Sequence, residues 1–224
     1  MAGGATLKTD PFSTQENHPD MLIIPHPQEP FPNFYNDLNG SLQMAWKMLG
    51  RATKDRKAAF RTPVMASVSD DGPQARVLVL RAADIDRREL IFHTDTRSGK
   101  AGQLGRDNRV AVTFYDAHRK IQLRINGIAQ LHTSDALADQ QWRDASPNAL
   151  RCFSAPLPAA PCALPSDHDD SEATRKTVAA GRQFFAVLSV GIVRLEWLYL
   201  HTHGQRRALF CWHEEQWQMQ WLNP

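Results

Sequence analysis

The 224-residue chain has no long hydrophobic run and almost no net charge. Without a stretch of about 18 apolar residues, no transmembrane helix is expected. The first ten residues also lack the apolar segment of a secretory signal. Lys and Arg number 26 against 24 Asp and Glu, a formal charge of +2. This balance argues against nucleic acid and membranes as partners but still allows a small cationic pocket.

Cysteine is scarce, and no pair has C-x-x-C spacing. The three residues are Cys152, Cys162 and Cys211. An odd, widely spaced set does not form a disulfide framework, which predicts a protein of the reducing cytoplasm. A metal site built from His201, His203, Cys211 and His213 is one interpretation, because strand residues two apart share a face. Polar residues at a strand end and turn explain them more simply, and no metal is expected.

Several nucleotide-binding and catalytic motifs are missing. The sequence contains neither G-x-G-x-x-G nor G-x-x-x-x-G-K-[ST], which argues against a Rossmann site and a P-loop. It also lacks G-x-S-x-G, H-E-x-x-H and an EF-hand loop. Any phosphate site must therefore be built in another way.

Proline is absent between Gln74 and Ser146, although the chain has 14 prolines. Because proline removes a backbone donor, it avoids central strands, so this window is where the sheet is expected. Residues 1–33 predict a flexible proline-rich arm. Residues 34–224 predict a single domain, with a long proline-rich loop at 147–170.

Hydrophobic periodicity predicts a mainly β protein. An amphipathic helix is expected from Asp37 to Thr53, capped by Asn36 or Asp37. Shorter helices are expected at 98–105, at 133–144 (capped by residue 133 or 134) and at 172–183. The expected strands are 64–68, 74–81, 89–94, 109–115, 120–132, 184–190, 192–201, 207–212 and 216–222.

These eight or nine strands do not alternate with helices, which predicts an antiparallel β-barrel with appended helices. The first three are expected to form a meander, with 82–88 as a polar connection. Gly127, inside a long alternating strand, is expected to form a bulge or bend.

Two segments together resemble an anion site. In the first, Arg76 and Arg81 are five residues apart and would face opposite sides of one strand. The second, Phe92–Lys100, runs from a strand into a helix N-terminus with free N–H groups. It carries hydroxyl and cationic groups at Thr94, Ser98, Arg97 and Lys100. Ordinary solvated charges are the alternative, but the basic strand upstream and Gln122 and Arg124 downstream favour a phosphate site.

An ordered set of segments resembles the pyridoxamine 5′-phosphate oxidase-like flavoproteins over about residues 60–224. It resembles most the FMN-binding subgroup related to the oxidase rather than the oxidase itself. The segments are Arg76–Arg81, Phe92–Leu104, Asn108–Tyr115, Gln122–Gly127, Glu196-Trp197, Arg206-Arg207, Trp217 and Trp221–Pro224.

The resemblance implies an FMN-binding split β-barrel, a homodimer with the flavin at its interface, and FMN-dependent oxidoreductase chemistry. The strand from Arg76 would lie along the flavin, Ser98 and Lys100 would bind the phosphate, and Arg207 would approach the ring near N1. Gly99 replaces a family arginine, for which Arg97 would compensate. The implied cofactor residues are Arg76, Val77, Leu78, Val79, Leu80, Arg81, His93, Thr94, Arg97, Ser98, Gly99, Lys100, Gln122 and Arg207.

The substrate half of the resemblance is weaker than the cofactor half. The oxidase's substrate-phosphate contacts fall around Trp142, Ser146 and Leu150. Its Arg-x-His pair falls at residues 203–205, and its flavin-contacting Trp at Leu198. We therefore expect FMN binding with altered substrate contacts and an unidentified small-molecule substrate. A flavin-binding module without turnover and a structural homodimer remain alternatives, as do a deazaflavin and heme as cofactors.

Overall fold

The computed structural model describes Met1 and residues 31–162, 173–201 and 204–224. The chain divides into two units, Met1–Pro32 and Asn33–Pro224, and everything below concerns the second. The arm expected at 1–33 therefore lies almost wholly outside the described residues. Among the described helices, none is long and apolar enough to cross a membrane.

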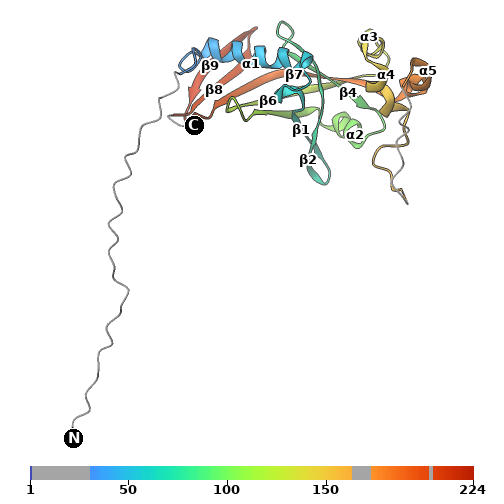
Figure 1. Cartoon of the computed structure of the whole chain (residues 1–224), viewed down its shortest axis with the longest axis horizontal. Coiled ribbons are helices and arrows are strands. Elements are labelled where there is room, and N and C mark those ends of the chain that lie inside the picture. Colours follow the sequence, from blue (N-terminus) through green and yellow to red (C-terminus); the bar gives the residue numbers. More distant parts are fainter. Residues whose placement is uncertain (2–30, 163–172, 202–203) are drawn as a thin grey trace. The chain divides into compact units, whose positions relative to one another are not determined.

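One antiparallel sheet of nine strands dominates the described residues (Figure 1). The strands are β1 (Val64–Ser69), β2 (Gly72–Val77), β3 (Leu80–Asp84), β4 (Glu89–Asp95), β5 (Arg109–Asp116), β6 (Ile121–His132), β7 (Phe185–Tyr199), β8 (Arg206–His213) and β9 (Gln216–Leu222). The α-helices are α1 (Leu38–Lys54), α2 (Gly99–Arg106), α3 (Ala136–Asp144), α4 (Pro147–Leu150) and α5 (Arg175–Val178). Three 3-10 helices are η1 (Ala59–Arg61), η2 (Arg151–Ser154) and η3 (Ala179–Phe184).

The strand order explains how the sheet closes. It runs β2-β1-β5-β6-β7-β4-β3, with β8 on β7 and β9 on β8. Although β2 and β3 lie at opposite ends of this order, only Leu78 and Val79 separate them in the chain. The two edges must therefore approach each other, and the sheet curls into a barrel that is closed by the chain itself. The expected antiparallel barrel with appended helices is confirmed.

The single strand expected at 74–81 is wrong, and so is the meander. Its first half pairs with β1 as β2, whereas β3 begins at Leu80 and pairs with β4. β3 also continues to Asp84, into the expected connection at 82–88. A continuous β-rich run cannot show that its two halves pair with different neighbours. Consequently Arg76 and Arg81 belong to different strands.

β7 is one strand of 15 residues, where two had been expected. One edge of β7 pairs with β6; the other pairs with β4 in its first half and with β8 in its second. The register of β6 against β7 shifts between Asn126 and Gly127, which confirms the expected bulge. A Cβ atom at Gly127 would lie 2.6 Å from the carbonyl oxygen of Gly191, so the two backbones meet at this point.

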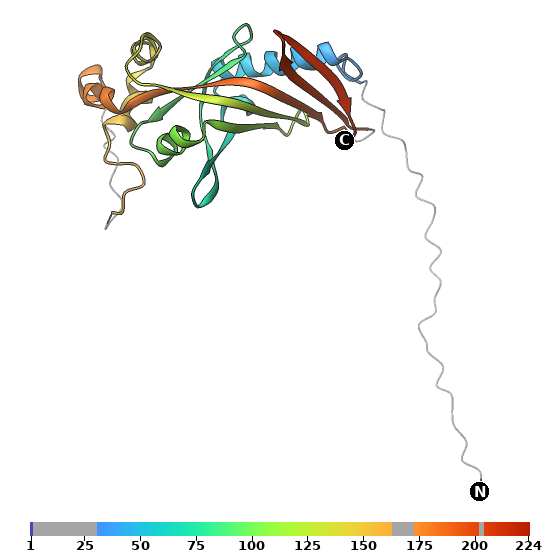
Figure 2. The same ribbon diagram turned by 180° about the vertical axis from the view of Figure 1, so that it is seen from behind.

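Helix α1 confirms the helix expected at Asp37–Thr53. The Asp37 side chain caps it by accepting a hydrogen bond of 3.0 Å from the backbone N–H of Asn39. Trp46 and Leu49 are buried in the main core, where α1 packs against β3 and β7 (Figure 2). The other face of α1 is left to border solvent.

Helices α3, α4, η2 and α5 cover a second apolar cluster, which includes Leu150, Phe153 and Phe185, whereas α2 and η1 pack against the main core. The expected loop at 147–170 is therefore wrong in its first part, because α4 and η2 occupy 147–154. Proline is favoured at the first helical position, and Pro147 begins α4 in this way. Residues 163–172 lie outside the described part. The helix expected at 172–183 is split between α5 and η3, and Asp135 caps α3 in place of Thr133 or Ser134.

Candidate functional site

Arg76 is held on the inner side of the barrel by β1 and α2. Its guanidinium donates hydrogen bonds to Ser67 Oγ at 2.7 Å and to Gln103 Oε1 at 3.0 Å. The Ser67 hydroxyl also donates to Gln103 Oε1, at 2.7 Å. Burial lowers the pKa of Arg76, because desolvation disfavours its charged form. Within the described part of the chain, no ion pair with a carboxylate compensates this charge.

The second cation of the site lies at the start of α2. Ser98 is the N-cap residue, and its hydroxyl accepts a hydrogen bond of 3.0 Å from Lys100 Nζ. Burial lowers the pKa of Lys100, and repulsion from Arg76 lowers it further. The first turn of α2 contains no acidic residue, so its N–H groups and positive dipole end add to the cationic field. A bound anion would relieve this repulsion.

Among the described residues, six buried polar side-chain atoms have no partner, and three of them belong to residues of the expected site: Arg81 Nε, His93 Nδ1 and Thr94 Oγ1. Burial lowers the pKa of Arg81, with a further contribution from Arg61. Burial lowers the pKa of His93 to about 4, although a 3.0 Å hydrogen bond with Gln141 opposes this shift. The imidazole is therefore neutral at neutral pH. Orphaned buried polar groups are costly, so these atoms need a ligand or water.

Arg97 differs from Arg76 and Lys100 because a carboxylate within the fold already pairs with its charge. Its Nη2 forms an ion pair of 2.7 Å with Asp95, and Nη1 and Nη2 donate to the carbonyls of Ala155 and Phe153. The guanidinium also lies 3.8 Å above the ring of Phe184. These contacts tie the turn before α2 to the segment around η2. They account for Arg97 without a phosphate, and the suggested compensation for Gly99 gains no support.

Gln122 and Arg207 lie elsewhere, in a row across β6, β7 and β8: Gln122 pairs with Leu198, which pairs with Arg207. The Arg207 side chain forms an ion pair of 2.7 Å with Glu196, which is only 5% exposed. Arg124 and Arg194 contact the same carboxylate at 3.2 and 3.1 Å. Burial opposes ionisation of Glu196, but the hydrogen bond from Arg207 and the charges of the arginines hold its pKa below the usual value.

This cluster of three arginines around Glu196 was not expected as a unit. Arg194 and Glu196 are two apart on β7, and Arg124 is opposite Glu196 on β6. Strand alternation could have grouped them, but only the register shows which residues are neighbours.

Register also places the two parts of the expected site on different faces of the sheet. Directly paired residues share a face, and the pairs Arg76–Met65, Met65–Val112 and Val112–Ile125 lead from Arg76 to the buried face of β6. Gln122 is three residues from Ile125 and therefore points to the outer face. A flavin against one face of a single chain does not reach both parts.

The side chains at the oxidase's substrate positions take part in packing. The Trp142 ring contacts Phe185 with centroids 5.2 Å apart, and Leu150 is fully buried. Ser146 caps α4 through Ala149. The described residues contain no group of three His, Cys, Asp or Glu that could hold a metal ion. Of the metal ligands considered from the sequence, His203 lies outside the described residues.

The inner-face part of the site fits FMN in its chemistry. Arg76, Lys100 and the start of α2 offer cations and N–H groups to a phosphate, and the unpartnered atoms of Arg81 and Thr94 can meet the heteroatoms of a flavin ring. His93 pairs with Val187 and contacts Phe185, so its ring points to the opposite face, toward the second apolar cluster.

Two solved structures share the fold of this chain. A pyridoxamine 5′-phosphate oxidase-related, FMN-binding protein from Nostoc punctiforme PCC 73102 has 25% identity and a TM-score of 0.64, over 88% of this chain and 100% of that chain. PhzG from Burkholderia lata 383, solved with tetrahydrophenazine-1-carboxylic acid, has 18% identity and a TM-score of 0.62, over 88% and 98%. The second likeness shows the fold alone.

Sequence comparisons point to the same family. A curated pyridoxine/pyridoxamine 5′-phosphate oxidase from Kineococcus radiotolerans is 37% identical over 62 residues. That match covers 27% of each protein, so the chain matches only about a quarter of the relative's length. The family model described as pyridoxamine 5′-phosphate oxidase matches residues 49–184, more than half of the chain. The chain therefore belongs to the pyridoxamine 5′-phosphate oxidase family.

Proposed function

We propose that this protein binds FMN between two copies of the chain and acts as an FMN-dependent oxidoreductase on a small substrate. The observation that carries the proposal is the inner-face group: two desolvated cations, Arg76 and Lys100, together with the unpartnered buried atoms Arg81 Nε and Thr94 Oγ1. In the chain without a ligand, neither the desolvated cations nor the unpartnered polar atoms contribute to stability. A phosphorylated heterocycle would pair with the cations and supply hydrogen-bond partners to the polar atoms.

The phosphate end of the flavin would lie at Arg76, Ser98 and Lys100. Arg76 is already oriented by Ser67 and Gln103, so its guanidinium needs no large rearrangement to bind an anion. Lys100 can turn its ammonium from the Ser98 hydroxyl to a phosphate oxygen while keeping the hydroxyl as a neighbour. Charge-assisted hydrogen bonds of this kind are stronger than neutral ones.

The flavin ring would lie beside Arg81 and the Val77–Leu80 segment. Leu78 and Val79 belong to neither β2 nor β3, which leaves this crossing segment between the two ladders. Bound FMN supplies a hydride acceptor at N5, and the chain supplies orientation and electrostatics.

A second copy of the chain would complete the site. The outer face that bears Gln122 and Arg124 also exposes apolar side chains: Val64 is 43% exposed, Val77 61% and Tyr115 50%. Exposed apolar side chains clustered on one face are typical of an interface. Pairing through this face would bring Gln122 and Arg207 of one copy against the partner copy, where they could contribute to a flavin site shared by the two chains.

The substrate would differ from that of the oxidase, because Trp142 and Leu150 are used in packing. The same observation favours the second candidate, a flavin-binding module without turnover. We place the protein in the cytoplasm, since its cysteines Cys152, Cys162 and Cys211 are free.

The first experiment is identification of the cofactor in the purified full-length protein. We expect a yellow protein absorbing at about 450 nm, with FMN found by mass spectrometry. A colourless protein that takes up no added FMN refutes the proposal. If mass spectrometry finds bound heme or a deazaflavin instead, that molecule replaces FMN as the assigned cofactor. Anaerobic reduction by NAD(P)H or by pyridoxine 5′-phosphate then separates an enzyme from a binding module.

The dimer has its own test in Val64→Asp. We expect this variant to sediment as a monomer and to bind FMN at least about tenfold more weakly, because it places a charge in the interface. Ile85→Asp is the matched control, since Ile85 is likewise an exposed apolar side chain, at 55%, but lies in the turn between β3 and β4. A monomeric wild-type protein with full FMN affinity would contradict the shared site.

A further inference from the structure

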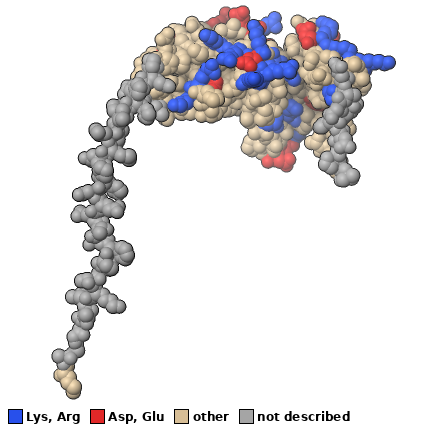
Figure 3. All heavy atoms as spheres, in the orientation of Figure 1, with Lys and Arg blue, Asp and Glu red and all other residues tan. Residues whose placement is uncertain are grey.

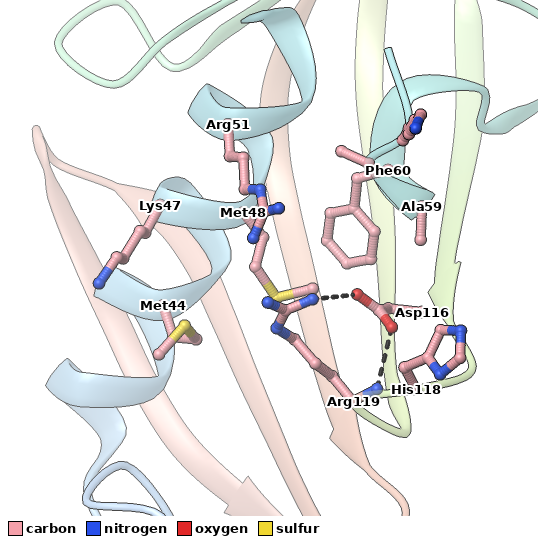
Figure 4. Close-up of a pocket in the computed structure, with 11 residues that line it drawn as sticks. Met44, Lys47, Met48, Arg51, Ala59, Phe60, Asp116, His118 and Arg119 are labelled. Carbon is pink, nitrogen blue, oxygen red and sulfur yellow. Dashed lines mark hydrogen bonds and ion pairs between the residues drawn. The ribbon is translucent and has the colours of Figure 1, made fainter. Parts of the chain in front are cut away.

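A cavity of about 260 Å³ lies between α1, η1 and the turn that follows β5 (Figure 4). None of the residues assigned to flavin binding lines it. On α1 its wall is formed by residues spaced three or four apart, which therefore share one helix face. These are Met44, Lys47, Met48 and Arg51. This face is separate from the face that carries Trp46 and Leu49 into the core.

The floor of the cavity is apolar and well packed. Met48 is 8% exposed and Phe60 only 2%, and Phe60 rests against Phe114 with ring centroids 5.1 Å apart. Met44 lines the cavity from the preceding turn of α1 (Figure 4). Methionine adapts its shape to planar groups, so the floor suits an apolar ring or chain.

The rim of the cavity is cationic, in a region where Lys and Arg gather on the surface near α1 (Figure 3). The rim cations are Lys47, Arg51, Lys57 and Arg119. Two of them are already paired: Arg119 with Asp116 at 2.9 Å and Arg51 with Asp55 at 3.0 Å. Lys47 and Lys57 have no ion pair with any described carboxylate. The rim thus keeps two uncompensated positive charges.

Asp116 does not turn the cavity into a cation site. Burial opposes its ionisation, but hydrogen bonds from the backbone and side chain of Arg119 hold its pKa below the usual value. Both carboxylate oxygens are engaged, with Oδ1 accepting from the Arg119 N–H and Oδ2 from its guanidinium. Asp116 therefore fixes Arg119 at the rim.

We propose that this cavity binds a small carboxylate with an aromatic or other compact apolar body. The apolar body would lie on Met44, Met48 and Phe60, and the carboxylate would meet Lys47 and Lys57. The cavity volume lies just below the range of about 300–1,000 Å³ that is usual for drug-sized ligands. A cavity of this size is too small for a dinucleotide. The proposal goes beyond flavin binding and does not depend on it.

The test uses the full-length protein labelled with [methyl-13C]methionine and titrated with 2-naphthoate, both alone and with excess FMN. We expect the methyl signals of Met44 and Met48 to shift and to saturate. Met65, whose carbonyl accepts a hydrogen bond from Arg76, reports on the inner-face group, and Met219 on β9, which does not line the cavity, reports on the main core. Neither should shift. Met44→Leu and Met48→Leu assign the signals.

Charge reversal provides the matched comparison. Lys47→Glu and Lys57→Glu should each weaken 2-naphthoate binding by about five- to tenfold, since an attraction becomes a repulsion at a partly exposed site. Lys54→Glu makes the same change on α1 outside the cavity and should alter binding by less than about twofold.

The neutral isostere 2-naphthamide should bind at least about fivefold more weakly than 2-naphthoate. Three results would overturn the proposal: no shift of Met44 and Met48 at millimolar 2-naphthoate, equal binding of the amide, or an equal loss in Lys54→Glu. A shift of Met65 alone would instead place the ligand in the inner-face group. Failure of flavin binding would leave all these outcomes readable, because the titration without FMN stands by itself.

Discussion

Replacement of Lys100 by methionine should weaken FMN binding without weakening the folded protein. Lys100 is held near Arg76 in a partly desolvated place, and both effects lower its pKa. Its charge is therefore unfavourable in the free protein at neutral pH. Methionine keeps most of the volume and removes the repulsion. We expect the ligand-free variant to unfold at the same temperature as the wild type or at a higher one.

The loss of affinity follows from the bond that Lys100 would make. A charge-assisted hydrogen bond contributes about 1.5–3 kcal/mol. Since about 1.4 kcal/mol corresponds to a tenfold change, the dissociation constant of FMN should rise roughly 10- to 150-fold. Ser98→Ala removes a neutral hydroxyl and should raise it by only about two- to tenfold.

The assay is quenching of flavin fluorescence during titration of the cofactor-free protein, combined with thermal unfolding of the same samples. Lys54→Met is the control, because Lys54 lies in the last turn of α1 and lines neither site. Unchanged affinity in both Lys100→Met and Ser98→Ala would refute the phosphate site. A loss of affinity accompanied by an equal loss of stability would instead assign Lys100 to the fold.

Three further perturbations test the surroundings of the site. The pKa of His93 is 6.5 in the unfolded chain and about 4 in the native chain, so the unfolded state binds more protons between these pH values. Denaturant unfolding should therefore show that up to about 3 kcal/mol of stability is lost as the pH falls from 6.5 toward 4. The variant His93→Leu should lack this loss. Glu196→Gln leaves three arginines facing one another, and calorimetry should show about 1–3 kcal/mol less stability; an unchanged melting temperature would contradict this. Gly127→Ala should destabilise the protein by about 1–3 kcal/mol, because the new Cβ would meet the carbonyl of Gly191. Gly50→Ala should stabilise helix α1 by about 0.5–1 kcal/mol, because a Cβ at Gly50 has no atom within 4 Å.

Local chemistry made much of the fold predictable. The helix after Asp37, the strand after Glu89 and the bulge at Gly127 follow from capping, alternation and glycine geometry, which act within a few residues. The cationic segment that ends at Lys100 was also visible, because a strand leading into a helix start is a local pattern.

Pairing was the part that local patterns could not show. The run from Arg76 to Arg81 is continuously β-rich, yet its halves pair with β1 and β4 at opposite ends of the strand order. Strand partners are chosen by long-range packing, and a shift of one residue exchanges the two faces.

The sequence by itself determined the elements, the antiparallel class and the position of the cationic segment, because these depend on period, turn chemistry and charge along the chain. Only the tertiary structure decided that Arg97 is used by the fold and that Gln122 and Arg76 lie on opposite faces. It also brought α1, η1 and the turn after β5 together around a cavity whose lining residues are far apart in the chain. Contacts between distant segments depend on register and on barrel closure, and neither is encoded in any short stretch of residues.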